Sequence, residues 1–318
     1  MQLACPIPKI LLPVDGSDDS KRAVLFSGCL GSFLGKGLAG ITLLRVIAGG
    51  YISRHLANVD YRAADLLKNS EVFRRVREEH VNQTIRPLLD DMEKVLRELG
   101  TDAAVTTLVT DGDAANEIIR VATEGNYTTI MMARRGITAR RGAALGSVTN
   151  KVIYAAYGHT VYVVGYRTLE RAACPIPRIL VPVDGSPYSI KGLEHAACLA
   201  AGLKDALGGI TLLRVINVAL HMERLRMGID PEIEAHDILD KGRQMLQEAG
   251  IREDLIQTKV RIGIPAEEII GDIETEDYNL VIMGRKGRTA LKEMLLGGVS
   301  STVLQRCGNP TFAIVGGV

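Results

Sequence analysis

Two glycine-rich loops carry the residues of this sequence that are best suited to hold an anion. The first loop reads Ala133-Arg-Arg-Gly136, followed after nine residues by Gly146-Ser147-Val-Thr149. The second reads Gly284-Arg-Lys-Gly287, followed after nine residues by Gly297-Gly298-Val-Ser300. Glycine lets the backbone approach an anion closely. The second cluster of each loop begins a predicted helix, whose first amides and dipole attract negative charge. Because the loops also offer hydroxyl groups and cationic side chains, we expect them to bind phosphate.

An aspartate in a repeated PVDGS segment accompanies each loop. These residues are Asp15 and Asp184, and the serine two positions later in each case, Ser17 or Ser186, is placed to cap a following helix. An aspartate in such a turn can contact a ligand or help to cap the following helix, and the two roles are compatible.

The chain is an internal duplication. Residues 4–17 and 173–186 are identical at twelve of fourteen positions, at an offset of 169 residues. Gly136 and Gly287 are only 151 residues apart, so the first half holds 18 more residues. A repeat of this length is a whole domain and not a solenoid unit. We therefore expect domain 1 over 1–168, with an insertion near 49–70, and domain 2 over 169–318.

Alternating strands and helices position the loops in both halves. Strands are expected at 9–14, 40–47, 104–109, 128–132 and 160–165, and again at 178–183, 209–216, 256–262, 280–283 and 311–315. Helices should fill the intervals, and Pro87 should kink or restart the long one before residue 100. This order predicts α/β architecture with two tandem doubly wound domains, each with a five-stranded parallel sheet. In such a sheet the ligand crevice lies beyond the carboxyl ends of the strands.

The spacing G-x2-G-x9-G-[ST], after a buried strand in a domain that begins PVDGS, resembles the nucleotide-binding signature of the ATP-binding universal stress proteins. The resemblance covers the chain once per half and implies a Rossmann-like, adenine nucleotide α-hydrolase-like fold that binds ATP, with or without Mg²⁺. It implies that Asp15 and Asp184 bind ribose and that the backbone at Val46 and Val215 holds adenine. For ribose and phosphates it implies Gly136, Gly146, Ser147 and Thr149 in half 1, and Gly284, Gly287, Gly297, Gly298 and Ser300 in half 2.

Each half departs from the signature at one position. Ala133 replaces the first glycine of half 1, and Gly298 stands where half 2 should have serine or threonine. A missing hydroxyl donor weakens binding by about 0.5–1.5 kcal/mol. We expect two usable sites of unequal affinity. The sequence leaves open whether one of them has lost the ability to bind a nucleotide.

The composition argues against several other classes of protein. The net charge is +1, and Trp is absent, so neither the basic excess nor the stacking platforms of a nucleic-acid binder are present. No apolar run is long enough for a membrane span. Five cysteines without a CxxC pair favour reduced thiols and a cytoplasmic location. The six histidines show no metal-ligand spacing.

The leading hypothesis is a stress-response or signalling protein in which nucleotide occupancy sets conformation or the choice of an unknown protein partner. One alternative is a slow ATPase or a nucleotidyl-transfer enzyme, although the sequence offers no convincing general base, catalytic residue or metal ligand. Another is a nucleotide-free interaction module. The resemblance also implies that the two halves pair through their last strands, and that two chains form a homodimer through sheet edges. The insertion is open to interpretation as a lid, an interface arm or a tolerated addition.

Overall fold

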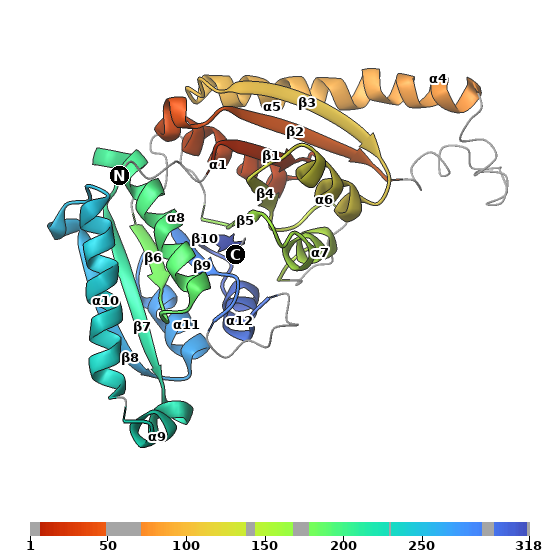
Figure 1. Ribbon diagram of the computed structural model, residues 1–318. Coiled ribbons are helices and arrows are strands. Elements are labelled where there is room, and N and C mark those ends of the chain that lie inside the picture. The colour runs from red at the N-terminus through yellow and green to blue at the C-terminus, as the bar shows by residue number, and fades with distance from the viewer. Residues whose placement is uncertain are drawn as a thin grey trace.

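The computed structural model describes residues 7–48, 71–137, 144–167, 178–228, 230–287 and 296–316 (Figure 1). The predicted insertion, the join between the halves and the central part of each glycine-rich loop lie outside the described residues. The described elements alternate between strand and helix in both halves, as the sequence predicts.

The described part of half 1 contributes five strands, of which all but the edge strand are mostly apolar. They are β1 (Lys9–Pro13), β2 (Gly40–Ile47), β3 (Ala104–Asp111), β4 (Thr129–Ala133) and β5 (Thr160–Val164). Its described α-helices are α1 (Asp18–Leu34), α4 (Glu71–His80), α5 (Arg86–Glu98), α6 (Ala114–Glu124) and α7 (Ser147–Ala155). A 3₁₀ turn, Gly35–Gly37, follows α1.

Half 2 repeats this plan. Its strands are β6 (Arg178–Pro182), β7 (Gly209–Asn217), β8 (Ile256–Gly263), β9 (Leu280–Gly284) and β10 (Thr311–Val315). Its described α-helices are α8 (Pro187–Leu203), α9 (Val218–Arg226), α10 (Pro231–Glu248), α11 (Pro265–Thr275) and α12 (Gly298–Arg306). The 3₁₀ turns Lys204–Ala206 and Glu253–Leu255 complete the described elements of this half.

All ten strands form one continuous sheet in the order β3-β2-β1-β4-β5-β10-β9-β6-β7-β8. Pairing is parallel within each half, whereas β5 and β10 pair antiparallel at the centre, with Val163 opposite Phe312. The expected pairing of the halves through their last strands is confirmed, and Figure 1 shows β5 and β10 side by side between them. One chain therefore forms a pseudo-dimer by itself.

Helices cover both faces of the sheet and bury its inner strands, whereas the edge strands β3 and β8 are largely half-buried or exposed. One core lies under α1, α5, α8 and α10 and includes Leu30, Leu89, Leu199 and Leu239. The other lies under α6, α7, α11 and α12 and includes Val152 and Val303. In half 1 the chain adds strands outward from β1 on one side and from β4 on the other, so the order of the strands reverses between β1 and β4. In half 2 it reverses between β6 and β9. These two switch points are where a doubly wound sheet can bind a ligand.

Pro87 restarts a helix as predicted. A π-helical turn, Val81–Ile85, joins α4 to α5, and the proline lies at the start of α5. Because proline has no amide hydrogen to donate to Gln83, regular helical bonding is interrupted there. Half 2 departs from the expected single long helix, since α9 and α10 are separate elements on either side of Gly228. Gly228 has a φ of +71°, a conformation that ends a helix, and Pro231 is the first residue of α10. The two helices are therefore separate.

The cysteines differ from the expectation of reduced thiols only. Cys29 on α1 is disulfide-bonded, whereas Cys307 is a free thiol. Burial raises the pKa of the Cys307 thiol to about 11, so this thiol is protonated and inert near neutral pH. None of the helices in the described ranges is both long and apolar enough to cross a bilayer.

Candidate functional site

A cavity of about 630 Å³ opens at the carboxyl ends of β6, β7 and β9 in half 2. Its walls come from these strand ends, from α9 and the start of α10, and from the start of α12. The cavity lies at the switch point of half 2, between β6 and β9. Its volume falls within the range of sites that bury a small organic ligand.

The structure brings together at this cavity all the half 2 residues that the sequence singles out. The residues lining it include Asp184, Val215, Gly284, Gly287, Gly297, Gly298 and Ser300. They are distant in sequence, and only the crossing of the strand ends places them around one space.

The cavity has an apolar region and a cationic region. Leu213, Ile269 and Met283 supply apolar side chains. The glycine-rich loop contributes Lys286, a lining residue that is only 7% exposed. The backbone at Gly298 begins α12, and a side chain there would meet no other atom within 4 Å. This arrangement suits a ligand with a flat apolar part and an anionic part.

The backbone of β7 continues past the end of β6. The Leu213 carbonyl accepts a hydrogen bond from the amide of Val183, just after β6 ends. Val215 lies two residues further along β7, so its backbone amide and carbonyl point to the same edge of the strand as those of Leu213. At this level β6 has already ended and does not cover that edge. Its carbonyl accepts a hydrogen bond from Arg214 Nη1 at 3.0 Å.

A charged group that the sequence pattern does not indicate lies on this side of the cavity. Glu234 on α10 forms ion pairs with Arg224 on α9 and, at 3.9 Å, with Arg214 on β7. All three residues line the cavity. The repeated LLRV segment contains Arg214 and its counterpart Arg45, but neither periodicity nor spacing indicates that Arg214 would face a carboxylate on another helix.

The aspartates of the DGS turns hold the turns in shape. Asp15 Oδ1 accepts from the Ser17 amide at 2.9 Å, and Asp184 Oδ1 accepts from the Ser186 amide at the same distance. Asp15 Oδ2 also accepts from the Ile137 amide at 2.8 Å, which ties this turn to the glycine-rich loop. The serines cap their helices as predicted, since Ser17 Oγ accepts from the Ser20 amide at 3.1 Å and Ser186 Oγ does so from Ser189.

The loop glycines make room for these aspartates. A Cβ atom at Gly287 would lie 2.7 Å from Asp184 Oδ2, and one at Gly136 would lie 2.4 Å from Asp15 Oδ2. Gly284 has a different reason, because its Cβ would lie 2.4 Å from the carbonyl oxygen of Tyr188 on α8. Half 1 has the buried Ala133 at the equivalent position.

The hydroxyl groups of two predicted phosphate-binding residues already donate within the protein. Thr149 Oγ1 donates to the Ala133 carbonyl at 2.8 Å, and Ser300 Oγ donates to the Gly284 carbonyl at 2.9 Å. Both side chains are buried. A phosphate at either site would instead have to use backbone amides at the start of the helix.

Half 1 places its predicted residues on the equivalent elements. Asp15 follows β1, Val46 is part of β2, and Gly146 caps α7, whose first residue is the exposed Ser147. The Gly146 amide donates to the Arg134 carbonyl, as the Gly297 amide does to Arg285. Four further basic residues of the two loops, Arg140, Arg141, Arg288 and Lys292, lie outside the described residues.

The first cation of each loop crosses to the other half. Arg134 Nη2 donates to the Leu304 carbonyl near the end of α12, at 2.6 Å. Arg285 donates to the carbonyls of Ile153, Tyr154 and Ala156 at the end of α7. Burial lowers the pKa of both guanidinium groups. These arginines therefore satisfy the last carbonyls of a helix in the opposite half.

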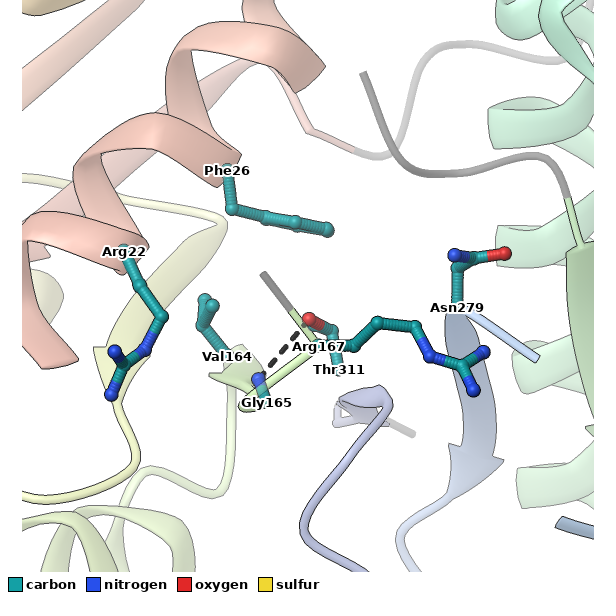
Figure 2. A pocket seen from close by; sticks show the side chains of 7 residues that line it. All are labelled: Arg22, Phe26, Val164, Gly165, Arg167, Asn279 and Thr311. Atoms are coloured by element: carbon teal, nitrogen blue, oxygen red, sulfur yellow. Dashed lines mark hydrogen bonds between the residues drawn. The ribbon is translucent and has the colours of Figure 1, made fainter. Parts of the chain in front are cut away.

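A second cavity, of about 10 Å³, lies where the two halves meet and has room for no more than about one water molecule. Figure 2 shows Arg22 and Phe26 from half 1, and Asn279 and Thr311 from half 2, around it. The Gly165 amide donates to Thr311 Oγ1 at 3.2 Å across this junction. The cavity is a packing feature of the interface and too small for an organic ligand.

Comparison with known proteins finds one family in both halves. The model of the universal stress protein family matches residues 6–157 and again residues 175–314. A universal stress protein of Mycolicibacterium smegmatis is 27% identical over 318 residues, which cover 96% of each chain. Another, from Methanocaldococcus jannaschii, is 28% identical over 143 residues, 43% of this chain and 81% of the relative.

Solved structures show the same fold over the whole chain. The crystal structure of a universal stress protein from Archaeoglobus fulgidus DSM 4304 superposes with a TM-score of 0.64 and 21% identity. The match covers 97% of this chain and 98% of that one. At this identity the likeness concerns the fold, including the tandem arrangement.

Proposed function

The chain belongs to the universal stress protein family, with two copies of the family's domain in tandem, and from this premise we propose that it binds a nucleotide, ATP foremost. The observation that carries the proposal is the half 2 cavity, which is lined by Lys286 and by all seven half 2 residues selected from the sequence. Occupancy of this cavity would set the conformation of the protein or its choice of a protein partner. The stress-response role comes with the family.

The lining of the cavity supports an extended nucleotide. The base would lie against Leu213 and Met283, with the backbone of Val215 as its polar contact, and the ribose would lie near Asp184. The phosphates would lie at the start of α12, beside Lys286, where backbone amides and a cation favour negative charge. We propose that Mg²⁺, where present, arrives bound to these phosphates.

The proposal extends to the organisation of the molecule. We assign residues 1–168 to domain 1 and residues 169–318 to domain 2. Pairing of two chains would use the outer strands of the sheet, β3 and β8, because β5 and β10 are already paired within one chain.

Nucleotide should be recovered from protein purified without any added. Denaturation followed by chromatography and mass spectrometry is expected to release about one ATP or ADP per chain. If the preparation is empty, a ligand at a hundred times its Kd should still stabilise the fold by about 2.7 kcal/mol, measured as a thermal shift with ATP and Mg²⁺. No released nucleotide and no shift at millimolar ATP would contradict the proposal.

Replacing Gly287 with alanine should lower the affinity for ATP by about tenfold. The new methyl group displaces the Asp184 carboxylate from beside the loop, so the proposed ribose contact is lost at a cost of about 1.4 kcal/mol. The free energy of unfolding should change by less than about 1 kcal/mol, since the displaced group is the end of a side chain. Calorimetric titration measures the affinity and chemical denaturation the stability.

Gly136→Ala is the matched variant in half 1, where the methyl group would displace Asp15 in the same manner. An affinity that is unchanged in both variants would argue against these loops as nucleotide sites.

A further inference from the structure

The phosphate-facing helices, α7 and α12, begin at the second glycine cluster of each loop, and each is held at its start by the backbone of that loop. The Gly146 amide, at the start of α7, donates to the Arg134 carbonyl at 3.0 Å. The Gly297 amide, at the start of α12, donates to the Arg285 carbonyl at 2.8 Å. The backbone of each arginine therefore helps to fix the amides that would face a phosphate.

The side chains of the same two arginines hold the phosphate-facing helix of the opposite half at its far end. Arg134 Nη2 donates at 2.6 Å to the Leu304 carbonyl, in the last turn of α12. Arg285 Nη2 donates at 3.1 Å to the Tyr154 carbonyl, in the last turn of α7. The Tyr154 hydroxyl is also 2.9 Å from Ser301 Oγ, near the middle of α12. These hydrogen bonds close a circuit from the loop of half 1 through α12 to the loop of half 2, and back through α7.

Both helices are short enough to carry a displacement from one end to the other. Each has nine residues, so each is about 13 Å long. Gly298, Val299 and Ser300, at the start of α12, line the half 2 cavity. Because backbone hydrogen bonds keep one helix of this length rigid, an anchor at Leu304 also constrains the position of these residues.

Overall stability gives a weak account of Arg134. Its guanidinium makes one hydrogen bond to the opposite half, while Nε and Nη1 are buried without a hydrogen-bond partner among the described residues. Buried donors that are not hydrogen-bonded cost free energy and so offset the bond that is made. The contribution of this side chain then lies in where it holds α12.

We propose that Arg134 and Arg285 are positioning residues that couple the two halves, because each holds the phosphate-facing helix of the opposite half. The loop of half 1 thereby sets the phosphate affinity of half 2, and a nucleotide in half 2 acts in turn on α7. The inference rests on the proposed nucleotide function and adds to it a route by which occupancy in one half reaches the other.

Calorimetric titration with ATP and with adenosine tests the action of Arg134 on half 2. The full chain carries Ser147→Asp, whose carboxylate at the exposed start of α7 repels phosphate from half 1, so that binding reports on half 2. Adding Arg134→Met should weaken ATP binding by about fivefold or more. Adenosine has no phosphate to meet α12, so its affinity should change by less than about twofold. Arg134→Lys can still donate to the Leu304 carbonyl and should restore most of the ATP affinity.

Arg120→Met is the matched control for the loss of a positive charge from half 1. Arg120 lies on α6 and pairs with Glu117 and Glu124 of the same helix, so its replacement should leave ATP affinity unchanged. Unchanged ATP affinity in Arg134→Met, or equal losses for ATP and adenosine, would overturn the coupling and leave nucleotide binding intact. So would ATP binding that disappears with Ser147→Asp alone, because the nucleotide would then lie in half 1. A native chain that binds neither ligand would overturn both proposals.

Hydrogen exchange tests the opposite direction, from half 2 to α7. In the Ser147→Asp chain, ATP should slow exchange in the last turn of α7 by about fivefold, whereas adenosine should not. The slowing should be smaller in Arg285→Lys, because a single ammonium replaces the planar guanidinium that bonds to several carbonyls there. Equal slowing by both ligands, or equal slowing in the two chains, would contradict the coupling.

Discussion

Replacing Arg285 with methionine is expected to lower the free energy of unfolding by about 3–5 kcal/mol. The buried guanidinium donates to the carbonyls of Ile153, Tyr154 and Ala156, at the end of α7 in the other half. Methionine keeps much of the volume but donates nothing, and each buried carbonyl without a donor costs about 1–3 kcal/mol. Because the chain has no tryptophan, urea unfolding is best followed by circular dichroism.

Arg134→Met is the matched variant. Arg134 makes one hydrogen bond to the opposite half, and its Nε and Nη1 atoms are buried without a hydrogen-bond partner among the described residues. Methionine removes these two unsatisfied groups together with one bond, so the net loss should be within about 1 kcal/mol. Equal losses in the two variants would show that the count of satisfied carbonyls does not govern the stability of this interface.

Acidification below pH 6.5 should destabilise the protein through His195. This side chain is buried on α8, with Nε2 2.6 Å from the hydroxyl of Tyr162 on β5. Burial lowers the pKa of His195 to about 4, so the folded protein holds it neutral, whereas the unfolded chain protonates it near pH 6.5. The stabilisation is complete above pH 6.5 and is lost as the pH falls towards 4, in total about 3 kcal/mol.

His195→Gln supplies the control for this pH dependence. Glutamine can still bond to the Tyr162 hydroxyl but does not titrate, so the fall in stability between pH 6.5 and pH 4 should be smaller by about 3 kcal/mol than in the native chain. Unfolding in urea at several pH values measures both curves. Parallel curves for the two proteins would contradict the assignment of this effect to His195.

Much of the fold follows from short-range patterns that the sequence displays directly. The repeated segments, the strand-helix alternation and the apolar strands predicted two doubly wound domains, and the structure has both. Local chemistry also predicted the serine caps at Ser17 and Ser186 and the helix restart at Pro87. Such features depend on residues close in sequence, where spacing translates directly into geometry.

The break that separates α9 from α10 escaped prediction, although Gly228 and Pro231 signal it locally. The segment on both sides of the break has helical composition. The missed break matters for the candidate site, because the separate helix α9 forms part of the cavity wall.

The sequence by itself determined which residues gather at the candidate site of half 2, because parallel strands deliver their carboxyl ends to one edge of the sheet. Only the tertiary structure decided what the loop cations do. Arg134 and Arg285 look like surface charges in sequence, yet each is buried against a helix of the opposite half. Contacts between segments more than a hundred residues apart are set by packing across the sheet, and local sequence carries no record of them.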